Sequence, residues 1–171
     1  MGVFMAFPVL GVAIMLQTAI FSRLPLLSGT TDIILLMLIA WALQKNVKNW
    51  VIVVWTLVGA GFISFISAVP AAATIFGYTA IVMVTRWLRT RIWQASLLAL
   101  FFMVVAGTFF HFTVVFSTLR FFENTPLVIS ESFVQVVLPS LVLNLLFAFP
   151  IYLLMKDLAD WLYPSEVEFN A

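Results

Sequence analysis

The stretch WVIVVWTLVGAGFISFIS, Trp50–Ser67, contains no charged residue over a length that suits a membrane-spanning helix. A span needs about 20 mainly apolar residues. The rest of the chain has the same character: of 171 residues, 64% are hydrophobic and 9% are charged, and the mean hydropathy is +1.19. A soluble domain carries roughly 25% charged residues, so lipid must be the main solvent outside this fold. The sequence therefore predicts an all-α, polytopic membrane protein.

Apolar runs separated by charged or turn residues predict a bundle of six transmembrane helices that forms a single domain, residues 1–171. The expected helices cover about 3–21, 31–43, 50–67, 72–87, 93–117 and 131–155, and a cytoplasmic tail covers 156–171. The second run is short for a span, so it either tilts in from an interface or is shielded by protein. The first run lacks a basic segment and a cleavage site, so we expect a retained helix rather than a signal peptide. The tail is expected to stay helical until Pro164 stops it.

Basic residues predict the orientation. Six of them map to loops or tail on one side: Lys45, Lys48, Arg86, Arg89, Arg91 and Lys156. Only Arg23 and Arg120 map to the other side. Basic residues are retained in the cytoplasm, so both termini are expected there, provided that the second helix spans. Tryptophans beside the same segments predict an aromatic belt at this interface, formed by Trp41, Trp50, Trp87, Trp93 and Trp161.

A ridge of small residues marks one face of the third helix. Its members recur every four residues: Thr56, Ala60, Ser64 and Ala68. Small residues let helix backbones approach closely, and packing drives helix association in lipid. The ridge therefore either packs against another helix of the same bundle, which is the commoner use, or docks a membrane helix of a partner.

Polar residues lie on two faces of the last helix. Gln135 and Pro139 share one face, and Ser140 and Asn144 share another. Pro139 cannot donate a hydrogen bond to the carbonyl of Gln135. Unsatisfied carbonyls are costly in lipid, so protein should cover this helix on more than one side. Gln135, Pro139 and Asn144 are therefore candidate partner-binding residues, and a kinked structural helix is the alternative.

Four further polar residues map to the outer side: Gln17, Asp32, His111 and Glu131. They form either the rim of an outward-facing cavity or separate interfacial groups, since acidic residues are favoured at helix N-termini. His111 is the one histidine of the chain. It is interpreted either as a relay or ligand, or, more commonly for such a residue, as a neutral side chain bonded to a backbone carbonyl or to Thr108.

Chemistry of other kinds finds little support in the sequence. There is no cysteine, and no catalytic triad, phosphate-binding loop or metal-ligand spacing occurs. The formal net charge of +1 gives no basic footprint for nucleic acid. We therefore expect neither an enzyme nor a cofactor, and no nucleic-acid partner.

An ordered set of motifs resembles the MreD family of rod shape-determining membrane proteins. Leu16–Leu43, LQTAIFSRLPLLSGTTDIILLMLIAWAL, has that family's Gln-Thr pair, a turn with proline and glycine, and an aspartate opening a Leu-rich helix. GAGFIS at Gly59–Ser64, with Gly77 downstream, is similar to its third and fourth helices. LPSLVLNLLFAFPIYLLM, Leu138–Met155, is similar to its last helix. One departure is that the acidic residue common after the Gly-Phe of the third helix is missing here.

The resemblance implies a non-catalytic component of the bacterial cell-elongation (rod) complex in the inner membrane, supporting peptidoglycan synthesis and rod shape. Such a protein is expected to bind the single-pass protein MreC directly. RodA, its class B penicillin-binding transpeptidase and the MreB filament are the wider partners, besides membrane lipid. The implied fold resembles the six-helix substrate-binding subunits of energy-coupling-factor transporters. The alternative is that the chain is itself such a vitamin-binding subunit. These subunits usually dock onto their transporter partner through small residues in the first helix, and here only Gly2 and Ala6 have that spacing.

Overall fold

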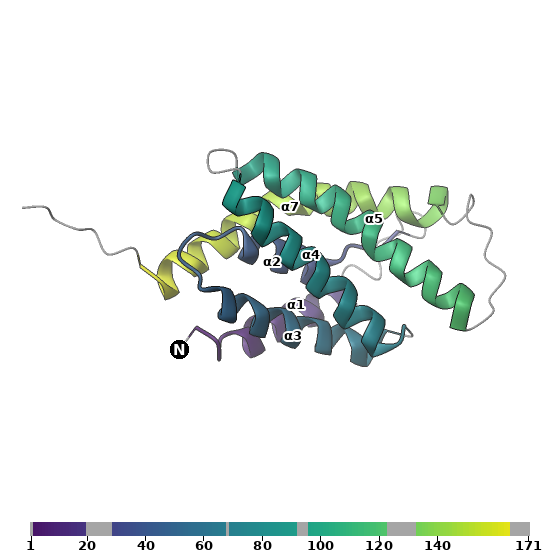
Figure 1. Ribbon diagram of the computed structural model, residues 1–171, viewed down its shortest axis with the longest axis horizontal. Helices are drawn as coiled ribbons and strands as arrows, with labels where there is room; N and C mark the ends of the chain where they lie inside the picture. The colour runs from purple at the N-terminus through teal and green to yellow at the C-terminus, as the bar shows by residue number, and fades with distance from the viewer. Residues whose placement is uncertain (1, 20–28, 68, 92–95, 123–132, 165–171) are drawn as a thin grey trace, which may run out of the picture.

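The structure is a computed structural model, and it describes residues 2–19, 29–67, 69–91, 96–122 and 133–164 (Figure 1). Within these ranges the chain is helical and contains no β-strand. The helices are α1 (Ala6–Ala19), α2 (Ile33–Ala42), α3 (Asn49–Ile66), α4 (Ala71–Arg91), α5 (Ser96–Phe122) and α7 (Leu138–Leu162). A π-helical turn, η2 (Phe133–Val137), leads directly into α7.

Four helical segments are long and apolar enough to cross a membrane: α3, α4, α5 and the continuous stretch Phe133–Leu162. The chain is therefore a multi-pass membrane protein. As described, α1 has 14 residues and α2 has 10, so both are shorter than a full span.

The short helix α2 lies at the centre of the bundle. It contacts α1, α3, α4, α5 and α7. The surrounding helices pack against one another in the order α1, α3, α4, α5, α7, but the backbones of α1 and α7 do not come close to each other. In Figure 1, α2 lies between α7 on one side and α1 and α3 on the other. The described helices thus form a ring around α2 that is open between α1 and α7.

The sequence of α2 explains its position. Every residue of IILLMLIAWA is apolar, and nine of the ten are buried. A helix that is apolar all round is stable where protein covers all its faces. At 1.5 Å per residue, α2 is about 15 Å long, which is about half of the hydrocarbon core. Of the two alternatives for this segment, shielding by protein is the one observed.

Three helices, α4, α5 and α7, extend beyond their expected C-terminal ends. α4 continues through Arg89 and Arg91, where the sequence predicts a basic loop after 87. Near this end of α4, Arg86 binds the carbonyl of Gln44 and Arg89 binds that of Leu43, which holds the end of the helix against the α2–α3 loop. α5 runs to Phe122 rather than ending at 117. α7 includes the first part of the expected tail and ends at Leu162, just before Pro164.

The two ends of the described chain meet at one end of the bundle. Trp55 Nε1 donates a 3.0 Å hydrogen bond to the carbonyl of Gly2. A Cβ on Gly2 would overlap the hydroxyl of Tyr163, so these residues are in direct contact. Asn46 Nδ2 donates to the carbonyl of Tyr163 over 3.2 Å. An even number of passes would place the two termini together in this way.

Three of the tryptophans predicted to form an aromatic belt are exposed at this same end. Trp50, Trp87 and Trp161 are 58%, 59% and 67% exposed. The prediction for Trp41 is wrong, since it is fully buried and stacks on Trp55 with ring centroids 4.3 Å apart. The reason is the central position of α2, whose last turn lies inside the bundle. Trp93 lies outside the described residues.

Candidate functional site

The N-terminus of α2 is capped by polar side chains from other helices. Asp32 is the N-cap residue, and its Oδ1 accepts a 3.0 Å hydrogen bond from the amide of Leu35. Its Oδ2 accepts a 2.5 Å bond from the hydroxyl of Tyr78 on α4. Its own amide donates to Oδ1 of Asn144 on α7 over 2.9 Å. One aspartate thereby joins three helices.

Three more side chains, Gln17, Thr108 and Ser140, belong to the same set. We call the six residues the α2 cap cluster: Gln17, Asp32, Tyr78, Thr108, Ser140 and Asn144. Asn144 Nδ2 donates to Oγ1 of Thr108 on α5 over 3.0 Å. Ser140 Oγ accepts from the amide of Thr30 at 2.9 Å. Gln17 Oε1 accepts from the amide of Ile34 at 3.3 Å. The cluster therefore draws on α1, α4, α5 and α7.

The cap cluster lies within the length of a candidate membrane-spanning helix, α4. Tyr78 is seven residues into α4, which is about 10 Å along the helix axis. The backbone just before α2 is not helical there. Non-helical backbone is tolerated at this depth only where protein or water covers it, because each unsatisfied amide costs several kcal/mol. The cap cluster supplies acceptors for amides at Thr30, Asp32, Ile34 and Leu35.

Gly29 allows this segment to lie against α7. A Cβ at Gly29 would stand 2.5 Å from Cβ of Pro139 and 2.7 Å from the backbone nitrogen of Ser140. Real Cβ atoms do not approach other atoms this closely, and backbone atoms cannot move aside as a flexible side chain does. Glycine is therefore required for the chain to pass Pro139 and reach Asp32.

The C-terminus of α2 is bound by two arginines of α4. Arg86 donates to the carbonyls of Ala42, Gln44 and Val47 at 3.3, 2.8 and 2.9 Å, and to Oδ1 of Asn49 at 2.8 Å. Arg89 donates to the carbonyl of Leu43 at 2.8 Å. Both guanidinium groups thus satisfy carbonyls that a helix end leaves unpaired.

The predicted outer-side residues have different positions. Gln17 and Asp32 come together as caps of α2. The ring of His111 lies edge-on to the ring of Tyr78, with centroids 5.3 Å apart, so it borders the cap cluster. Thr108, which was expected as its hydrogen-bond partner in place of a backbone carbonyl, accepts a hydrogen bond from Asn144. Glu131 lies outside the described residues.

The ridge on α3 faces inward where it is described. Thr56 and Ala60 are buried, and α3 packs against α1, α2 and α4. The hydroxyls of Thr56 and Ser64 donate to carbonyls of their own helix, at Ile52 and Ala60. Packing within the bundle is therefore the use that the structure favours for this ridge. Ala68 lies outside the described residues.

On the last helix, Pro139 and Asn144 also contact the protein's own chain, at Gly29 and Asp32. Gln135 is exposed, within the π-helical turn η2. That turn ends at Val137, directly before α7 begins at Leu138. The irregular backbone therefore lies next to Pro139, which has no backbone N–H to donate. Of the candidate residues on this helix, Gln135 alone offers a free surface.

An apolar groove occupies the opening of the ring between α1 and α7. It has a volume of about 660 Å³, and Ile33 and Met37 of α2 form its floor. One wall is formed by the stretch from Met5 to Leu16, and the other by α7 from Phe147 to Leu158. All the side chains that line it are apolar. Sequence reasoning missed this groove, because nothing in the order of the helices indicates that the first and last stay apart.

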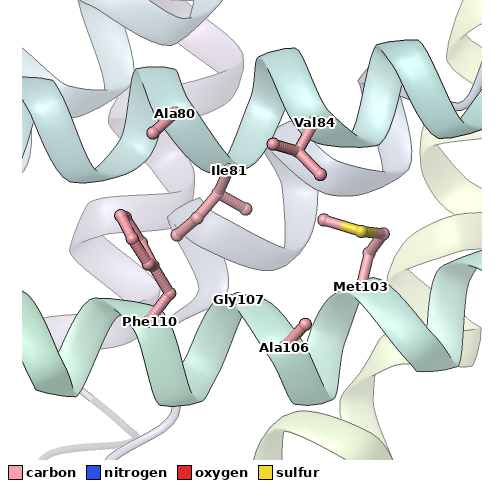
Figure 2. A pocket seen from close by; sticks show the side chains of 7 residues that line it. All are labelled: Ala80, Ile81, Val84, Met103, Ala106, Gly107 and Phe110. Carbon is pink, nitrogen blue, oxygen red and sulfur yellow. The ribbon is translucent and has the colours of Figure 1, made fainter.

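A smaller crevice of about 200 Å³ lies between α4 and α5 (Figure 2). Figure 2 shows Gly107 and Ala106 of α5 across from Ile81 and Ala80 of α4. A Cβ on Gly107 would lie 3.1 Å from Cγ2 of Ile81 and 3.3 Å from Cδ1 of Ile39. Gly107 therefore lets α5 approach both α4 and the central helix.

Within the described residues, no group of three His, Asp or Glu side chains comes together as a metal site would require. Comparisons with profiles of protein families, with curated proteins and with solved structures gave no match. The interpretation of this chain therefore rests on its own residues and their geometry.

Proposed function

We propose that this chain is a non-catalytic scaffold of the MreD type. In this proposal it lies in the bacterial inner membrane, binds an MreC-type single-pass protein, and supports peptidoglycan synthesis by RodA and its class B transpeptidase along the MreB filament. The observation that carries the proposal is the apolar groove between α1 and α7. A partner's membrane helix seated there would close the ring around α2.

The dimensions of the groove suit a helix. Each wall covers twelve residues, Met5–Leu16 and Phe147–Leu158, or about 17 Å of helix axis. The lining includes Met5, Met37 and Met155, three of the seven methionines of the chain. Methionine adapts its shape to irregular surfaces and is common at binding faces. Such a lining can receive a row of apolar side chains from another helix.

The cap cluster is a second, independent observation that supports the resemblance to MreD. Gln17, Gly29, Asp32, Pro139 and Asn144 come from the opening and final motifs that resemble MreD. In the structure these residues are joined around the start of α2. A shared structural role explains why these five residues would occur as an ordered set. A chance resemblance between apolar helices would not place the five residues in contact.

The vitamin-binding alternative fits the groove less well. Sites for small molecules place a few polar groups within an apolar lining to orient the ligand. The residues lining this groove supply none from their side chains. The implied likeness to energy-coupling-factor subunits therefore enters the proposal as a likeness of helix arrangement only.

We also propose that both termini are cytoplasmic. Gly2 and Tyr163 lie together at the end of the bundle that carries Lys45, Arg86 and Lys156. Basic residues concentrate on the cytoplasmic side of bacterial membrane proteins.

The proposal is tested by co-expressing the tagged full chain with an MreC-type protein that the same genome encodes, and purifying the two together. A stoichiometric complex that survives size exclusion is expected. Leu154→Trp, in the groove, should reduce recovery of the partner, whereas Leu146→Trp should not. Both leucines lie on α7 and are 67% and 65% exposed, but Leu146 is outside the groove. Failure to recover the partner with a folded, monodisperse chain would refute the proposal.

A further inference from the structure

A third cavity differs from the other two in being polar and charged. It has a volume of about 300 Å³ and lies where the α2–α3 loop meets the last turns of α7 and the start of α5. Its charged members are Lys45, Lys156 and Asp160. Gln44, Asn46, Ser96 and Tyr152 supply further polar groups. Two cations and one anion in a small cavity suit a ligand that itself carries both signs of charge.

The wall of this cavity is held in place by other residues. Arg86 binds the carbonyls of Gln44 and Val47, and Arg89 binds that of Leu43. Gln44 Nε2 donates to the carbonyl of Ala40 over 2.9 Å. The two arginines therefore hold the α2–α3 loop in place, while Lys45 and Lys156 line the cavity. A preformed site binds a ligand at lower entropic cost than one that must first be ordered.

The cavity lies at the level expected for lipid headgroups. Exposed tryptophans mark the membrane–water interface, and Trp161 is one residue after Asp160. Trp50 and Trp87 are exposed at the same end of the bundle. Basic pockets between transmembrane helices on the cytoplasmic side are known to hold phosphate headgroups.

Both helices that adjoin the cavity carry exposed apolar side chains close to its lining residues in sequence. On α5, Leu97 follows Ser96 directly, and Phe101 lies one turn further along; both are exposed. On α7, Phe149 is exposed one turn before Tyr152. Acyl chains attached to a headgroup in the cavity would find apolar side chains on both adjoining helices, whereas a free phosphate would not use them.

We propose that this cavity binds the headgroup of an amine-bearing glycerophospholipid. Lys45 and Lys156 hold the phosphate, and Asp160 receives the ammonium group. The site is separate from the α1–α7 groove, since its α7 residues are Tyr152, Lys156 and Asp160, whereas the groove uses Ile151, Leu154 and Leu158.

The test is native mass spectrometry of the full chain, purified in detergent and titrated with phosphatidylethanolamine, phosphatidylglycerol or inorganic phosphate. We expect phosphatidylethanolamine to bind best. The double variant Lys45→Ala, Lys156→Ala should weaken its binding by at least about tenfold. Asp160→Asn should remove the preference for phosphatidylethanolamine over phosphatidylglycerol while binding of both persists.

The matched control is Lys48→Ala, because Lys48 belongs to the same loop, is exposed, and does not line the cavity. All variants change exposed side chains, and their unfolding temperatures verify that the bundle is intact. Equal lipid binding by the double variant and the control would overturn the proposal. Tighter binding of inorganic phosphate than of either lipid would overturn the lipid assignment as well.

Discussion

The amide of Asp32 donates a 2.9 Å hydrogen bond to the side chain of Asn144, which is 112 positions away in the chain. This bond joins the start of the central helix to the last helix of the bundle. The side-chain amide of Asn144 also donates a hydrogen bond to Thr108 through its Nδ2, so one buried side chain joins α2, α5 and α7. The bundle is thus organised around the ends of α2, where its backbone groups need partners.

Asn144→Ala should destabilise the protein by about 2–6 kcal/mol, since it leaves the Asp32 amide and the Thr108 hydroxyl unpaired, each at about 1–3 kcal/mol. Asn144 is 1% exposed, so water cannot replace the lost partner. Thermal and denaturant unfolding in detergent, followed by the intrinsic fluorescence of the six tryptophans, measures the change.

Thr113→Ala serves as the control for this experiment. Thr113 is an exposed residue of α5 whose hydroxyl donates to the carbonyl of Phe109 in its own helix. Its loss should cost less than about 1 kcal/mol. Equal effects of the two substitutions would show that the cap cluster contributes nothing special to stability.

Gly29→Ala should prevent the segment before α2 from lying against α7. The added Cβ meets backbone atoms of Pro139 and Ser140 at 2.9 and 2.7 Å, so the two segments must separate. We expect a loss of several kcal/mol or failure to accumulate in the membrane. Gly61→Ala is the matched control, because nothing lies within 4 Å of its Cβ and α3 is helical there. Gly61→Ala should stabilise by about 0.5–1 kcal/mol; a larger loss there than at Gly29 would contradict this account.

Arg86→Lys should weaken the α2–α3 loop although the charge is kept. The guanidinium of Arg86 binds three carbonyls and Asn49 at once, and an ammonium group cannot reproduce this planar arrangement. Limited proteolysis should cut the loop at Lys45 or Lys48 faster in the variant, by about tenfold for a loss of 1.4 kcal/mol. Arg91→Lys is the comparison, since Arg91 only lies over the ring of Trp87 at 5.6 Å. Unchanged cleavage in Arg86→Lys would show that the loop does not depend on this residue.

Membrane-protein class, the approximate helix positions and the importance of Asp32 and Asn144 could be predicted from the sequence. Hydrophobic run length reports membrane spans directly, and a polar residue within an apolar run must have a partner. Pro139 was also recognised, because proline removes a backbone donor within its helix, whereas Gly29 was expected only as part of a turn.

The arrangement of the helices could not be predicted in the same way. Apolar runs carry no record of which helix is central, so the burial of Trp41 and the shielding of α2 depend on tertiary packing. Arg86 and Arg89 are basic residues near a helix end, a pattern that also predicts an exposed loop. Tyr78 was missed because its partner, Asp32, lies 46 positions earlier and no local spacing connects them.

Site-specific photo-crosslinking in the membrane tests the central claim most directly. A photoreactive phenylalanine derivative is placed at position 154, inside the α1–α7 groove, or at position 146, outside it on the same helix. With an MreC-type partner co-expressed, the account predicts a crosslink to the partner's membrane helix from position 154 and little from position 146. Efficient crosslinking from position 146 with none from position 154 would contradict it.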